Sequence, residues 1–112
     1  MGAVGYIRVS SPSQVDKYSL DVQERLFFEL CKSRGWEIIG VYREEDRSAH
    51  VEAISKRLVF RQMLDDAGKH QFDVVVVHTL DRWSRNIKVS LEALTILGKH
   101  NVGLVSISEQ LD

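Results

Sequence analysis

The sequence predicts an α/β fold, with a mostly parallel sheet of about four or more strands and helices on both faces. Short runs rich in β-branched residues alternate with amphipathic segments in the order βαβαβαβ, which is typical of parallel strands joined by right-handed crossovers. One run, Val74–Val77, is apolar at every position, as expected of a strand covered on both faces at the centre of such a sheet. A length of 112 residues fits one domain.

The first strand is expected over Ala3–Val9, and a polar loop follows over Ser10–Tyr18. Ser19 is a suitable N-cap for a helix over Leu20–Arg34, and Gly35 fits the position just beyond its end. The apolar stripe of this helix comprises Leu20, Phe27, Leu30 and Cys31.

The second strand is expected over Trp36–Tyr42, and the charged segment Arg43–Lys56 is expected to be a loop. A helix over Leu58–Ala67 then leads to a third strand within Phe72–His78. The inward residues of this helix are expected to be Val59, Phe60, Met63, Leu64 and Ala67.

The last third of the chain begins with a charged turn, expected over Thr79–Asn86. A helix over Ile87–Lys99 and a strand over Asn101–Ile107 complete the pattern. The apolar side of this helix is expected to comprise Ile87, Leu91, Leu94 and Leu97.

The composition excludes several classes of protein. A hydrophobic fraction of 44% is too high for a disordered chain, and no apolar run approaches the ~20 residues that span a membrane. The single cysteine, Cys31, cannot form an internal disulfide, and no signal peptide opens the sequence, so we expect a cytoplasmic protein. A net charge of −1 argues against a sequence-blind nucleic-acid coat but leaves a local cationic site open.

Ligands of open α/β sheets bind beyond the carboxyl ends of the strands, so the residues that follow each predicted strand should meet there. The first strand ends at Arg8-Val9-Ser10, the second is followed by Glu44–Ser48, and the third by Leu80–Arg85. One edge of the sheet should therefore gather a serine, several arginines and at least two carboxylates.

This set of residues favours phosphoryl transfer over acyl transfer. No G-x-S-x-G elbow surrounds Ser10, and the only histidines near these segments are His50 and His78. Arginine forks match phosphate oxygens and can stabilise charge in the transition state, while Asp81 could relay a proton. The arginines expected to cradle a phosphodiester are Arg8, Arg57, Arg82 and Arg85.

Four blocks of residues, in a fixed order, extend over most of the chain. They are Tyr6-Ile7-Arg8-Val9-Ser10 with Gln14, then Ser19-Leu20-Asp21-Val22-Gln23, then Asp46…Ser48…Arg57, then Leu80-Asp81-Arg82-Trp83-Ser84-Arg85. In this order and spacing they resemble the catalytic domain of the serine site-specific recombinases, the resolvase/invertase family, which includes the large serine integrases. The residues around Tyr18-Ser19-Leu20 favour the large integrases.

The resemblance implies a role for each of these residues. Ser10 would attack a DNA phosphodiester and become joined to the 5′ phosphate, releasing a 3′ hydroxyl. Asp81 would act as acid or base. The residues that would bind and activate the phosphate are Arg8, Arg82 and Arg85, with Arg57 assisting. The residues that would support the site are Tyr6, Gln14, Gln23 and Asp46.

The resemblance also implies partners. The substrate would be double-stranded DNA at recombination sites, cut and rejoined by dimers that pair into a synaptic tetramer, for integration, inversion or resolution. Neither ATP nor a metal would be needed, because the phosphoserine bond conserves the energy of the ester. A dimerising helix and a DNA-binding domain would follow Asp112, no membrane would be involved, and the gene would be bacterial or carried by a phage or mobile element.

Two other classes of function remain open at this stage. A metal-dependent nuclease or phosphatase could hold magnesium through Glu44, Asp46 and Asp81, although clustered arginines would compete for those carboxylates. A receiver-like regulatory domain would need an aspartate at the end of the third strand, where this sequence has His78-Thr79. No Cys–His cluster has the spacing of a zinc site.

Overall fold

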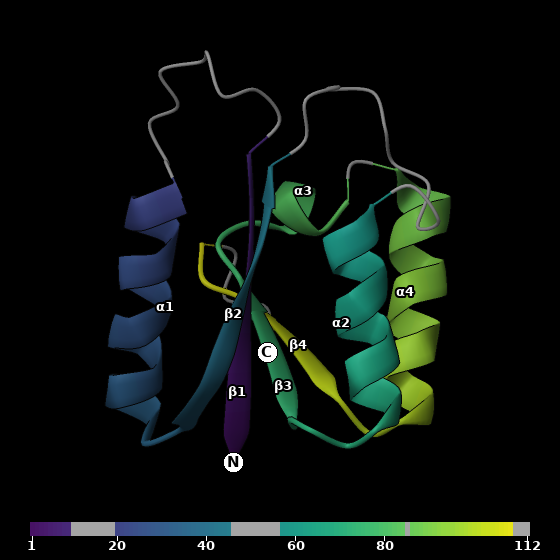
Figure 1. Ribbon diagram of the computed structural model, residues 1–112. Helices are drawn as coiled ribbons and strands as arrows, with labels where there is room; N and C mark the ends of the chain where they lie inside the picture. The colour runs from purple at the N-terminus through teal and green to yellow at the C-terminus, as the bar shows by residue number, and fades with distance from the viewer. Residues whose placement is uncertain (10–19, 46–56, 85, 109–112) are drawn as a thin grey trace.

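The fold is a four-stranded parallel sheet between two layers of helices, as the sequence predicts (Figure 1). It is seen in a computed structural model that describes residues 1–9, 20–45, 57–84 and 86–108. In chain order the elements are β1 (Gly2–Val9), α1 (Leu20–Arg34), β2 (Glu37–Glu45), α2 (Leu58–Gly68), β3 (Val74–Val77), α3 (Leu80–Trp83), α4 (Ile87–Lys99) and β4 (Gly103–Ser106).

The strand order is β2-β1-β3-β4, so the chain first moves outward from β1 to β2 and then crosses to the other side of β1. Helix α1 covers one face of the sheet, while α2 and α4 cover the other (Figure 1). The direction of winding therefore changes between β1 and β3. In open α/β sheets the carboxyl ends of two such strands flank the ligand crevice.

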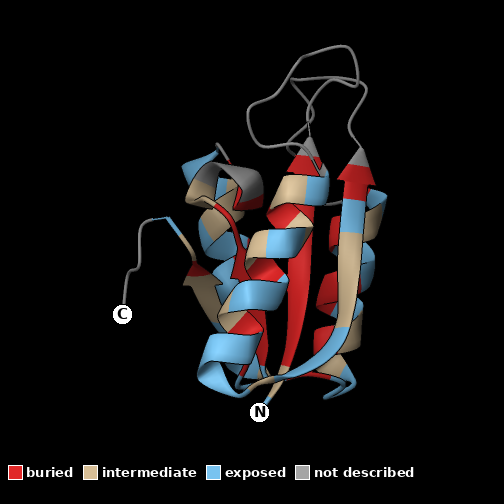
Figure 2. Ribbon diagram, turned by 90° about the vertical axis from the view of Figure 1, so that its left-hand side faces the viewer, coloured by how far each residue is buried: buried red, intermediate tan, exposed pale blue. Residues whose placement is uncertain are grey.

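The α1 face has a small apolar core. Phe27 and Cys31 are buried against the sheet together with strand residues such as Val76, which confirms Cys31 as a core residue. Gly5 allows the close approach of α1, because a Cβ atom there would lie 2.8 Å from the ring of Phe27. The central strands are accordingly buried along most of their length (Figure 2).

The opposite face has a larger core centred on three aromatic rings. Phe60 lies between Trp83 and Tyr6, with ring centroids 4.7 Å and 5.2 Å away. Tyr6 and Trp83 meet edge-on at 6.4 Å, the geometry that ring quadrupoles favour. Trp83 is fully buried, so its indole is part of this core.

Two predicted boundaries were wrong. Residues Arg43–Glu45, expected in a loop, continue β2, because β1 pairs with this strand as far as Val9 opposite Glu45. Residues Leu80–Trp83, expected in a turn, form the short helix α3, since burial of Trp83 anchors one helical turn against the core.

The predicted apolar side of α4 was wrong at three of its four positions. Ile87, Leu91 and Leu94 are exposed, whereas Leu97 is buried as predicted, together with Ala93. The helix packs beside α2 and β4 through a narrow face on which the small Ala93 permits close contact. Within the described ranges, no helix has both the length and the apolar character needed to cross a membrane.

Candidate active site

The carboxyl end of β1 is held in place by a glutamine from α1. The Gln23 side chain donates from Nε2 to the carbonyl oxygen of Arg8 at 3.3 Å, and its Oε1 accepts from the Arg8 backbone N–H at 3.4 Å. This amide pairs with the backbone as a neighbouring strand would, at a point where pairing with β3 has already ended at Gly5. Both residues are buried, so these contacts fix the backbone two residues before Ser10.

Beside Arg8, three buried polar side chains form what we call the Tyr6–Glu44–Arg57 cluster. The Tyr6 hydroxyl donates to Oε1 of Glu44, and it accepts a hydrogen bond from Nη2 of Arg57 at 2.7 Å. Nε of Arg57 lies 3.6 Å from the same Glu44 oxygen. Tyr6 and Arg57 are fully buried and Glu44 is only 5% exposed, so water screens this ion pair weakly.

The cluster joins β1 and β2 to the start of α2. The second carboxylate oxygen of Glu44, Oε2, accepts from the backbone N–H of Val59 at 3.0 Å, in the first turn of the helix. An anion is favoured at this end of a helix dipole. Arg57, just before the helix, places its guanidinium carbon 3.9 Å from the centroid of the Phe60 ring, within range of a cation–π interaction.

Burial raises the pKa of the Tyr6 hydroxyl well above its ordinary value, although the positive charge of Arg57 acts in the opposite direction. The phenol therefore remains protonated and can act as the donor to Glu44. Because the charges of Glu44 and Arg57 oppose each other, the cluster carries little net charge despite its burial.

Helix α3 lies against β1 and β3, at the same edge of the sheet (Figure 1). Trp83 at its end anchors it, with the indole Nε1 donating to the Ser90 carbonyl at 3.5 Å. The backbone of Asp81 and Arg82 is thereby held near the carboxyl ends of the two central strands.

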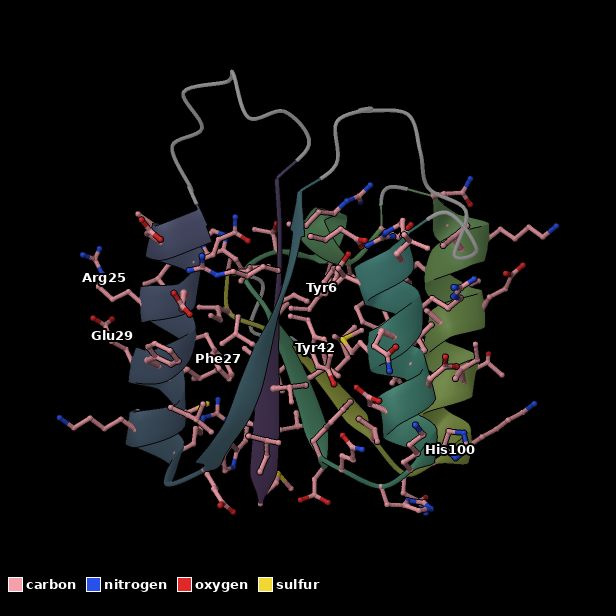
Figure 3. The ribbon with its side chains drawn as sticks, in the orientation of Figure 1. Tyr6, Arg25, Phe27, Glu29, Tyr42 and His100 are labelled. Atoms are coloured by element: carbon pink, nitrogen blue, oxygen red, sulfur yellow. The ribbon has the colours of Figure 1, made fainter. Side chains whose placement is uncertain are left out.

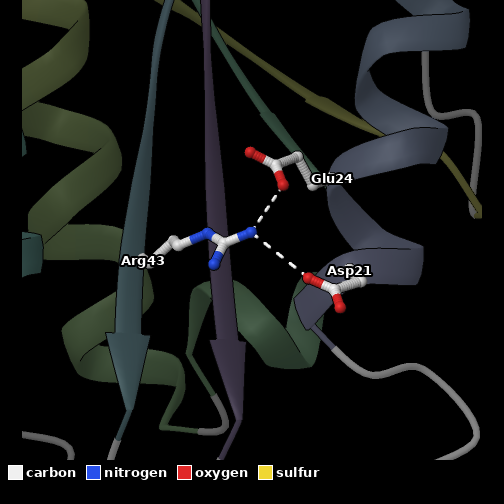
Figure 4. Close-up of polar contacts among 3 residues, drawn as sticks. All are labelled: Asp21, Glu24 and Arg43. Atoms are coloured by element: carbon white, nitrogen blue, oxygen red, sulfur yellow. Dashed lines mark hydrogen bonds and ion pairs between the residues drawn. The ribbon is translucent and has the colours of Figure 1, made fainter.

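On the α1 face, an exposed ion pair connects the same end of β2 to the first turn of α1. Nη2 of Arg43 contacts carboxylate oxygens of both Asp21, at 3.4 Å, and Glu24 (Figure 4). The hydrogen bond to Glu24 is the main cause of a raised Arg43 pKa. Arg43 and Glu44 are adjacent in β2, so they point to opposite faces of the sheet.

The sequence model of the family described as the resolvase N-terminal domain matches residues 3–112 of this chain. The chain belongs to this family. No curated protein sequence matches the chain.

Several solved structures are similar to this resolvase-type serine recombinase domain. A resolvase family site-specific recombinase from Streptococcus pneumoniae is 29% identical, with a TM-score of 0.84 over 100% of this chain and 75% of that chain. The N-terminal catalytic domain of TP901-1 integrase matches at a TM-score of 0.88 and 24% identity, over 100% of this chain and 82% of that one. The C-terminal catalytic domain of ISC1926 TnpA, an IS607-like serine recombinase, matches at 0.77 and 20%, over 96% and 67%. The last two show likeness of fold alone.

The structure brings together a subset of the site residues predicted for this recombinase domain. Tyr6, Arg8, Gln23 and Arg57 lie around the carboxyl end of β1, and all four are buried. Only the backbone positions of Asp81 and Arg82 are described. The residues that fall outside the described ranges are Ser10, Gln14, Asp46 and Arg85.

Glu44 was not among the residues predicted for the recombinase site. In the structure its carboxylate contacts Tyr6, Arg57 and the backbone of Val59. The sequence placed Glu44 among the carboxylates at this edge of the sheet, and the only role considered for it was that of a magnesium ligand in the alternative nuclease. One signal could have found it: if β2 is extended to Glu45, Glu44 lies directly opposite Arg8 in the ladder. Over the residues whose placement is described, no three His, Cys, Asp or Glu side chains gather as a metal site.

Proposed function

We propose that this serine recombinase domain cuts and rejoins double-stranded DNA through a covalent bond to Ser10. The Ser10 hydroxyl oxygen attacks the scissile phosphorus and loses its proton, and the bond from phosphorus to the 3′ oxygen breaks. The 3′ oxygen gains a proton, leaving a 3′ hydroxyl and a 5′-phosphoserine. Asp81 exchanges the proton with the entering or leaving oxygen. Attack by a 3′ hydroxyl on the phosphoserine reverses these steps and frees the enzyme.

The observation that best supports this proposal is the arrangement at the carboxyl ends of β1 and β3. The winding of the sheet changes between these strands. Arg8 is the next-to-last residue of β1, two residues before Ser10, and α3 carries Asp81 and Arg82 against the same strands. A chain in which these segments were remote from one another could not combine a serine with arginines around one phosphate.

In the proposed site, Arg8, Arg82 and Arg85 bind the phosphate and stabilise the charge that develops on its oxygens. Arg57 assists from the buried side, through the Tyr6–Glu44–Arg57 cluster. The phosphoserine keeps the energy of the broken ester, so the reaction requires neither ATP nor metal. Strand exchange further requires dimers that pair into a tetramer, for which a helix and a DNA-binding domain after Asp112 are expected.

A nicked suicide DNA substrate, which traps the covalent intermediate, tests the proposal in the full-length protein. We expect Ser10→Ala to abolish the DNA–protein adduct, while the neighbouring Ser11→Ala and Ser13→Ala variants retain it, because only Ser10 follows Arg8 by two residues. An undiminished adduct in Ser10→Ala would refute the assignment of the nucleophile.

The same substrate separates the recombinase from a metal nuclease. Cleavage by the full-length protein should persist in excess EDTA, because the proposed site stabilises phosphate charge with arginines rather than a cation. Loss of cleavage with EDTA, restored by magnesium, would favour the nuclease.

A further inference from the structure

We infer that Glu44 is a positioning residue of this site, one that holds Arg57 and the start of α2 in register with the strand end that carries the nucleophile. The inference rests on the proposed function, because it assigns Glu44 a part in the chemistry of Ser10. Glu44 touches no substrate in this role; it acts through Arg57 and Tyr6.

The first argument is that both oxygens of the Glu44 carboxylate are used, and their partners come from different elements. Oε1 accepts from the Tyr6 hydroxyl of β1 and meets Nε of Arg57, which precedes α2. Oε2 accepts from the Val59 N–H within α2. A single buried group thus sets the relation of two strands and one helix at the edge of the sheet.

The second argument is the place of Glu44 in the ladder. Glu44 is the register partner of Arg8, and Tyr6 lies two residues before Arg8 on the same face of β1. Gln23 fixes the backbone of Arg8 from the α1 face, and Glu44 fixes the tyrosine beside it from the opposite face. A displacement of Glu44 would therefore move Arg57 relative to the end of β1.

The third argument is energetic. Burial of an ion pair costs hydration free energy, and the Coulomb attraction between the two charges barely offsets that cost. Apolar residues of similar volume would therefore often stabilise the fold equally well. What the pair adds is a defined geometry, in which the Arg57 guanidinium is held by Tyr6 and Glu44 above the Phe60 ring. Such a fixed cation is useful where charge develops on a nearby phosphate.

Glutamine cannot replace Glu44 without losing this geometry. A carboxamide has one acceptor oxygen and one donor nitrogen. If its oxygen faces Tyr6 and Arg57, its NH2 group opposes the Val59 N–H, and if it is turned over, the NH2 group opposes Nε of Arg57. Either orientation sets two donors against each other, so we expect Arg57 or α2 to shift.

The test measures single-turnover DNA cleavage by the full-length protein at saturating DNA, with DNA affinity measured separately. We expect Glu44→Gln to slow cleavage roughly ten- to a hundredfold, as small misplacements of catalytic groups do, while affinity changes less than about twofold because the cluster is buried. Arg57→Gln should slow cleavage by a similar factor, and the double variant should be no slower than either single one. Multiplied effects in the double variant would overturn the inference, because the two residues would then act independently.

Asp66→Asn is the matched control. Asp66 also accepts a hydrogen bond from a tyrosine, Tyr42, at 2.6 Å, but its other described partner is the amide of Gln62 rather than an arginine, and it lies farther along α2. Its cleavage rate per folded molecule, with folding followed by near-ultraviolet circular dichroism, should equal that of the unmodified protein. Equal slowing in Asp66→Asn and Glu44→Gln would reduce Glu44 to a structural role and overturn the inference.

Further results keep the inference testable if Glu44→Gln does not fold, and they separate it from the proposed function. If Glu44→Gln does not fold, Glu44→Asp decides: it keeps the charge but is one methylene shorter, so an intermediate rate is expected and an unchanged rate would refute positioning. If the unmodified protein forms no adduct through Ser10, the proposed function itself fails. If the adduct forms normally and Glu44→Gln cleaves at the unmodified rate, only the inference fails.

Discussion

Two tyrosines that each donate a hydrogen bond to a carboxylate, Tyr6 and Tyr42, lie side by side on one face of the sheet (Figure 3). The surroundings of these two contacts differ. Tyr6 of β1 and Tyr42 of β2 are register partners. Tyr6 is fully buried, and its acceptor Glu44 also meets an arginine. Tyr42 is half-buried, and its acceptor Asp66 is also bound by Gln62 from within α2, at a partly exposed position.

The difference shows how burial changes what the same contact does. Burial raises the pKa of both tyrosines, so each remains a protonated donor. The Tyr42–Asp66 contact fastens α2 to the edge strand, and water can replace part of it. The Tyr6–Glu44–Arg57 cluster is closed to water, so the loss of any member leaves the others without compensation.

Removal of the buried arginine should have the largest effect. We expect Arg57→Met to lower the free energy of unfolding by about 3–5 kcal/mol, because Glu44 would remain as a buried charge without its cation. Urea unfolding followed by circular dichroism measures this change. The same substitution combined with Glu44→Leu should recover much of the loss. A double variant as unstable as the sum of both changes would contradict this account of the cluster.

Removing the hydroxyl group of either tyrosine should have a smaller effect on the free energy of unfolding, and the two losses should differ. Tyr6→Phe should cost roughly 1–3 kcal/mol, because a buried acceptor and a buried arginine both lose the hydroxyl. Tyr42→Phe should cost only about 0.5–1.5 kcal/mol, since Gln62 and water still reach Asp66. Urea midpoints of the two variants, at equal slope, give the comparison. Equal losses would mean that burial and Arg57 add nothing to the Tyr6 contact.

The sequence predicted the fold where patterns are local. The limits of α1 and α4, the buried valines of β3 and the positive φ of Gly35 all follow from periodicity, capping and glycine preference. The end of β2 was missed because charged residues there resemble a loop, and only pairing with β1 shows that they extend a strand. The exposed stripe of α4 was missed because periodicity identifies an apolar side but does not show what packs on it.

The candidate site was predicted in part for a similar reason. Motif residues such as Tyr6, Arg8 and Gln23 do gather at one strand end. The contacts that join them could not be read from the sequence, because they connect residues as far apart as Arg57 and Tyr6. Glu44 is the clearest case: its neighbours in the sequence are charged and ordinary, and its importance comes entirely from three partners on other segments or elements.

The smallest effect should come from the exposed arginine next to Glu44 in β2. Arg43 is 44% exposed and pairs with Asp21 and Glu24 on the α1 face. Because water and salt screen such pairs, Arg43→Ala should lower the free energy of unfolding by no more than about 1 kcal/mol. That difference should disappear near 1 M NaCl, where the screening length is roughly 3 Å. The loss from Arg57→Met should instead persist at the same salt concentration, since ions do not enter the buried cluster. Urea unfolding of both variants at low and high salt makes the comparison, and a salt-resistant loss above about 2 kcal/mol for Arg43→Ala would show that an exposed pair can hold this edge as firmly as a buried one.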